Sequence, residues 1–95
     1  MSKAYELMYV LSVAQGDEVV EATHQRVQDL VSQGAEIVDV DVWGKRRLAY
    51  EINDEKEGYY VVVKFNSDPN YPAEIDRVLK ITENVLRHLI VKIEE

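Results

Sequence analysis

The segment from Val38 to Ile52 alternates apolar with polar or charged residues at a period of two, with one interruption around Gly44. The apolar positions are Val38, Val40, Val42, Leu48, Tyr50 and Ile52. Successive side chains of a strand point to opposite faces of a sheet, so this spacing predicts one long strand with its apolar side chains on one face. A lone glycine within a strand usually marks a bulge or a close approach of another backbone.

The same segment holds the only run of adjacent basic residues in the chain, Lys45-Arg46-Arg47. One interpretation is a solvated strand face whose cations pair with Asp39 or Asp41. The other is contact with phosphate, because the planar fork of arginine binds a phosphate group through two hydrogen bonds. A contact of that kind carries no information about base sequence.

The order of the expected elements predicts the fold class. Strands are expected over residues 5–12, 35–53, 59–65 and 85–93, and helices from Asp17 to Gly34 and from Pro72 to Thr82. A polar hairpin loop, residues 54–58, joins the second and third strands. The order β-α-β-β-α-β predicts an α+β, ferredoxin-like split β-α-β fold: a four-stranded antiparallel sheet with both helices on one face and the first and third strands at its centre.

Length and composition bound the remaining possibilities. Ninety-five residues are enough for a single domain, expected to span residues 1–95. The chain contains no cysteine, and no apolar run approaches the roughly 20 residues that a membrane-spanning helix needs. We therefore expect a cytoplasmic protein without disulfides.

The net charge of −7 argues against unspecific coating of nucleic acid, because proteins that bind in this way are usually basic. The cations are nevertheless unevenly distributed. Outside the Lys45-Arg46-Arg47 run, a second group consists of Arg77, Lys80, Arg87 and Lys92. We expect a specific binding site with local positive charge, helped by a basic partner.

The aromatic and histidine side chains are explained more simply by packing in the core than by ligand binding. The tyrosines on the two expected central strands are Tyr5, Tyr9, Tyr59 and Tyr60. Only one parity of each strand can face away from the helices, so we expect most of these rings to pack against them. His24 and His88 each fall among apolar residues at the spacing of their element, which favours packed side chains over metal ligands.

Several separated motifs resemble those of the bacterial small-subunit ribosomal protein six family. They are Gly44-x-Arg46-Arg47-Leu48-Ala49-Tyr50-x-Ile52-Asn53, the first strand Tyr5-Glu6-Leu7-Met8-Tyr9-Val10-Leu11, the Gly58-Tyr59-Tyr60 triplet, and the region from Asp76-Arg77 to Asn84-Val85-Leu86-Arg87. The likeness covers nearly the whole chain, and the motifs agree in order and spacing.

The resemblance implies a structural constituent of the small ribosomal subunit, with no enzymatic activity and no cofactor. It further implies binding to the central domain of 16S rRNA together with ribosomal protein eighteen, as a heterodimer. The residues expected to contact RNA or partner are Lys45, Arg46, Arg47, Tyr50, Arg87 and Lys92. For Tyr50, a place in the core beneath the helices is the other interpretation, and the one its spacing favours.

Two other classes of function remain to be weighed. A ferredoxin-like regulatory domain that binds a small molecule as a dimer would carry a glycine-rich loop after the first strand, and here that loop has only Gly16. A phosphate-binding enzyme of this fold would need a cation in the same loop, which has none, and no set of nucleophile, base and orienting residue is readable.

Overall fold

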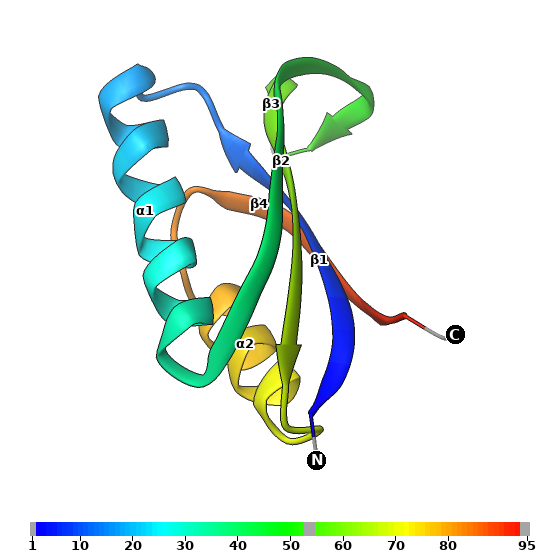
Figure 1. The fold of residues 1–95 in the computed structure, drawn as a ribbon. Coiled ribbons are helices and arrows are strands. Elements are labelled where there is room, and N and C mark those ends of the chain that lie inside the picture. The colour runs from blue at the N-terminus through cyan, green and yellow to red at the C-terminus, as the bar shows by residue number, and fades with distance from the viewer. Residues whose placement is uncertain (1, 53–54, 94–95) are drawn as a thin grey trace.

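The computed structural model describes residues 2–52 and 55–93, without the side chains of residues 49–52 and 55. In chain order the elements are β1 (Lys3–Ser12), α1 (Asp17–Gly34), β2 (Ala35–Ile52), β3 (Glu55–Ser67), α2 (Tyr71–Lys80) and β4 (Val85–Lys92). The strands form one antiparallel sheet in the order β2-β3-β1-β4. Both helices cover the same face of this sheet (Figure 1), so the predicted fold and its central strands are confirmed.

The hairpin between β2 and β3 differs from the prediction. Residues 55–58 were expected in a loop, yet they belong to β3. The pairing passes from Arg47 opposite Glu57 to Ile52 opposite Glu55, so β2 carries extra residues there and the hairpin end curls over (Figure 1). The polar composition of these residues predicts a loop. They form a strand instead because their backbones pair with β2 at an exposed end of the sheet, where charged side chains can remain in solvent.

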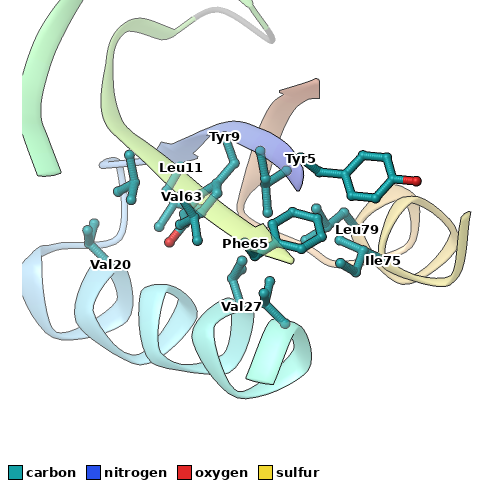
Figure 2. Close-up of a cluster of buried hydrophobic side chains, with 12 residues drawn as sticks. Tyr5, Tyr9, Leu11, Val20, Val27, Val63, Phe65, Ile75 and Leu79 are labelled. Carbon is teal, nitrogen blue, oxygen red and sulfur yellow. The ribbon is translucent and has the colours of Figure 1, made fainter. Parts of the chain in front are cut away.

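The core lies between the sheet and the two helices. Tyr9, Val63 and Phe65 from the central strands are almost fully buried, and Figure 2 shows such side chains directed toward the helices. The helices contribute Val20, Val27, Val31, Ile75 and Leu79. Tyr5, Tyr9 and Tyr59 pack on this side, which confirms that most of the strand tyrosines face the helices.

A hydrogen bond links the two helices at the beginning of α2. Pro72 lies in the first turn of α2, as predicted, where its missing N–H costs no helical hydrogen bond. The hydroxyl of the neighbouring Tyr71 donates a hydrogen bond to the backbone carbonyl of Leu30 in α1. In the described part of the chain, neither helix has the length and apolar character needed to span a membrane.

From Asp39 to Val42 the alternation in β2 separates the two faces as predicted but does not bury the valines. Val40 and Val42 lie opposite Val63 and Val61, whose side chains face the helices, whereas Asp41 lies opposite Val62 on the other face. Val40 and Val42 nevertheless remain 38% and 46% exposed. Because β2 is an edge strand, no further strand covers its outer side.

A partly buried hydrogen-bond network ties the central strand β1 to α1. The Tyr9 hydroxyl lies 2.7 Å from His24 Nδ1 and accepts a hydrogen bond of 3.0 Å from Gln28 Nε2. Burial raises the pKa of Tyr9, so its hydroxyl stays protonated and is able to donate a hydrogen bond to His24 Nδ1. His24 is therefore a packed histidine, as predicted, and its neutral tautomer with an unprotonated Nδ1 accepts this hydrogen bond.

This network makes stability depend on pH. Burial lowers the pKa of His24 below its usual value near 6.5, and the charge of Glu21 opposes the shift. The folded state therefore binds the proton less readily than the unfolded chain, and stability should fall as pH decreases below about 6.5. We expect the melting temperature of the wild type to drop more than that of His24→Gln between pH 7.5 and 5.

An NMR titration of the His24 imidazole gives the direct measurement, with an expected midpoint below 6.5. A midpoint at or above that value, or identical pH dependence of the two melting temperatures, would contradict the assigned role of this network.

Candidate functional site

Gly44 shapes the middle of the exposed strand. Its φ angle is +81°, and the pairing of β2 with β3 shifts between Val42 and Gly44, so Trp43 is the extra residue of a β-bulge. Apart from Gly44 itself and its two chain neighbours, no described atom lies within 4 Å of where a Cβ would stand on Gly44. Of the two predicted roles for this glycine, the bulge is confirmed and the close approach is not found among the described residues.

The bulge is followed by the three predicted cations, which the structure separates. Lys45 lies opposite Tyr59, on the helix side, and lines a hollow together with Asp17 and Glu21 of α1. Arg46 lies opposite Gly58, on the face that carries no helix. Lys45 is therefore in an acidic environment that does not favour phosphate.

Arg46 and Arg47 line a second, shallow hollow together with Trp43 and Tyr60. The rings of Trp43 and Tyr60 are stacked, with centroids 6.3 Å apart and planes 10° apart. Trp43 Nε1 donates a hydrogen bond of 2.9 Å to Asp41 Oδ2. We call these four residues, Trp43, Arg46, Arg47 and Tyr60, the aromatic–arginine hollow.

The predicted pairing of the basic run with Asp39 or Asp41 is not seen: among the described residues, no ion pair joins these acids to Lys45, Arg46 or Arg47. Trp43 was not predicted as a site residue. The sequence does show that the single tryptophan lies beside a strand glycine and a basic run. The alternation of apolar and polar residues, however, does not reveal to which face a bulge directs the tryptophan side chain.

The remaining predicted site residues occupy different places. Arg87 of β4 lies opposite Val10, which lies opposite Tyr60, so Arg87 shares the helix-free face and the row of the aromatic–arginine hollow. Lys92 lies opposite Tyr5, on the helix side and at the other end of the sheet. The side chain of Tyr50 lies outside the described residues.

Leu48, which was expected to share a helix-facing apolar set with Tyr50, is 8% exposed. A Cβ built on Gly58 would meet both Leu48 and Val10, which places Leu48 over the helix-free face. For Leu48 the expectation of a helix-facing position is therefore wrong. The bulge at Trp43 exchanges the faces of the β2 residues that follow it, so Leu48 shares the helix-free face with Arg46, and period-two spacing without the bulge does not anticipate this.

The second predicted cationic group is largely neutralised on α2. Arg77 pairs with Glu74, and Lys80 pairs with Asp76 at 3.0 Å.

His88 Nε2 lies 2.6 Å from Asp76 Oδ1, and the hydrogen bonds from His88 and Lys80 lower the pKa of Asp76. His88 is thus a packed histidine that links β4 to α2. Within residues 2–52 and 55–93, no cluster of three potential metal ligands occurs.

Comparison with known proteins identifies the family. The family model described as "Ribosomal protein S6" matches residues 4–92. The chain belongs to the ribosomal protein S6 family. Accordingly it is a structural component of the small ribosomal subunit in the bacterial cytoplasm, and not an enzyme.

Individual relatives agree over nearly the full length. "Small ribosomal subunit protein bS6" of Clostridioides difficile is 51% identical over 87 residues, which are 92% of this chain and 95% of the relative. The protein of the same name from Caldanaerobacter subterraneus is 45% identical over 94 residues, which are 98% of this chain and 99% of the relative. The crystal structure of 30S ribosomal protein S6 from Thermotoga maritima is 25% identical, covers 98% of this chain and 89% of its own, and has a TM-score of 0.91.

Proposed function

We propose that this chain binds the central domain of 16S rRNA together with small-subunit ribosomal protein eighteen, as a heterodimer. The observation that carries the proposal is membership of the ribosomal protein S6 family over residues 4–92. The protein acts as an assembly and scaffolding part of the small subunit. Its contribution is binding, and it needs no cofactor.

The charge distribution supports the use of a protein partner. A net charge of −7 gives the chain little affinity for RNA through counterion release, which is driven by contacts between cations and phosphates. A basic partner complements this acidic surface, speeds encounter and supplies the missing positive charge. RNA affinity then belongs mainly to the pair.

The experiment is a filter-binding titration of a 16S central-domain fragment at one salt concentration, with and without an equimolar amount of the partner. We expect weak binding by the chain alone and tight binding by the pair. Equal affinities in the two titrations would contradict cooperative assembly, and failure of the pair to bind would contradict the proposal.

Arg46 and Arg47 are the cations of this surface best placed for phosphate, because both are exposed and neither forms an ion pair with a described residue. We expect Arg46→Ala and Arg47→Ala each to weaken RNA binding by the pair about 10- to 150-fold, equivalent to about 1.5–3 kcal/mol for a lost charged hydrogen bond. Thermal stability should change by only about 0.5 kcal/mol, as at other exposed positions.

The matched control is Arg26→Ala, which removes the same charge from the exposed surface of α1. Its RNA affinity should remain within about threefold of the wild type, since distant exposed charges are screened by salt. If all three variants bind alike, Arg46 and Arg47 form only a solvated strand face.

A further inference from the structure

The aromatic–arginine hollow combines features that a merely solvated strand face does not need. Its volume is about 480 Å³, and its described lining consists of two aromatic rings and two guanidinium groups. Trp43 remains 47% exposed, although tryptophan is among the side chains that gain most from burial. An exposed ring in this setting offers a flat apolar face to a ligand.

The indole is held in place from two sides. One face stacks with Tyr60, and its N–H is bound to the carboxylate of Asp41. The backbone of Tyr60 is fixed in turn because it belongs to β3, a central strand paired on both sides. A ring that is already oriented loses little conformational entropy when a ligand binds, which favours affinity.

We propose that the aromatic–arginine hollow takes one unpaired nucleotide of RNA, with its base stacked on the exposed face of Trp43 and its phosphate bound by Arg46 or Arg47. This inference rests on the proposed function and adds to it a site and a ligand class. Every base has a π-face, so stacking of this kind accepts any sequence. Bases within a duplex are already stacked, so the hollow selects unpaired nucleotides.

Other hollows lined by described residues fit phosphate less well. The one beside Lys45 contains the carboxylates of Asp17 and Glu21. The groove between the helices contains both Arg26 and Asp29. In the aromatic–arginine hollow no carboxylate belongs to the described lining, and the nearby Asp41 is engaged by the indole N–H.

The sole tryptophan of the chain is the natural probe. Single-stranded oligoadenylate of eight nucleotides should quench the fluorescence of Trp43 in this chain as it binds, since a stacked base lies against the ring. A self-complementary RNA duplex of the same length and at the same salt should leave the fluorescence unchanged.

The decisive variants are Trp43→Leu and Trp43→Phe, tested with the partner and a labelled 16S central-domain fragment by fluorescence anisotropy. Loss of one stacked base should weaken binding about 5- to 150-fold in Trp43→Leu. Trp43→Phe keeps an aromatic face and should stay within a few-fold of the wild type. Melting curves establish that both variants are folded.

The outcomes are distinct. If Trp43→Leu binds RNA as well as the wild-type pair does, the nucleotide site is refuted and the proposed function stands. If Trp43→Leu loses affinity for the partner in the absence of RNA, the hollow is a protein-docking site and the inference is wrong. If the wild-type pair itself does not bind the RNA fragment, the proposed function fails, and the inference fails with it.

Discussion

Phe65→Ala should destabilise the domain by about 3–5 kcal/mol, the usual cost of removing a fully buried aromatic ring. Phe65 is 1% exposed, and its ring stacks on Tyr5 with centroids 5.6 Å apart. Figure 2 shows it directed toward Ile75 and Leu79 of α2. Its removal leaves a cavity where the sheet meets both helices, and the strands on either side cannot close it.

The measurement is urea unfolding, in which the midpoint should fall while the slope stays constant. For a domain of this size the melting temperature should drop by at least about 12 °C, at 4 °C or more per kcal/mol. Val38→Ala is the control, because Val38 is 59% exposed and its truncation should cost no more than about 0.5 kcal/mol. A loss below 1 kcal/mol for Phe65→Ala would show that the core relaxes around the missing ring.

The fold was predictable from the sequence because local signals and topology agree. Apolar residues at helical spacing lie on the covered side of α1, and β1 is apolar on both faces, as befits its place between β3 and β4. Pro72 and Gly44 have the local roles their residue types favour. Four strands and two helices in this order leave few arrangements in which both helices bury their apolar sides.

The hairpin was less predictable because its conformation depends on a long bulge. The register shift after Arg47 adds residues to β2 at the hairpin end, and the earlier shift between Val42 and Gly44 exchanges the faces of the residues that follow it. Leu48 therefore lies over Val10 on the helix-free face instead of beneath the helices. A single residue inserted in a strand exchanges the two faces, and no periodicity reveals where the insertion falls.

The candidate site was only partly predictable for the same reason. The basic run was readable, and Lys45 and Arg46 lie on opposite faces because successive strand residues alternate, but alternation does not explain why Arg47 joins Arg46 in one hollow. The pairing of Arg77 and Lys80 with acids of their own helix follows from i,i+3 and i,i+4 spacing and was available in the sequence. The stacking of Trp43 on Tyr60 joins residues of β2 and β3, so predicting it would require the pairing register of these two strands.

Gly58→Ala is the second substitution for which a large effect is expected, and here the cause is excess volume. A Cβ at this position would lie 2.3 Å from Val10 Cγ1 and 3.4 Å from Leu48 Cδ2. Val10 is 2% exposed and β-branched, so its methyl groups have no alternative place to turn. Overpacking of this kind costs about 1–3 kcal/mol or more, and we expect the upper part of that range.

A double-mutant cycle with Val10→Ala tests the cause. The second substitution removes the clashing methyl group, so the double variant should be more stable than the sum of the single effects predicts, by about 0.5–3 kcal/mol. Gly16→Ala serves as control: its φ angle is +95°, and beyond its own chain neighbours no described atom lies within 4 Å of the added Cβ, so its cost arises from backbone conformation alone. That cost should add to the effect of Val10→Ala without coupling. If Gly58→Ala is also additive with Val10→Ala, the close approach of Gly58 to β1 does not limit the residue allowed at this position.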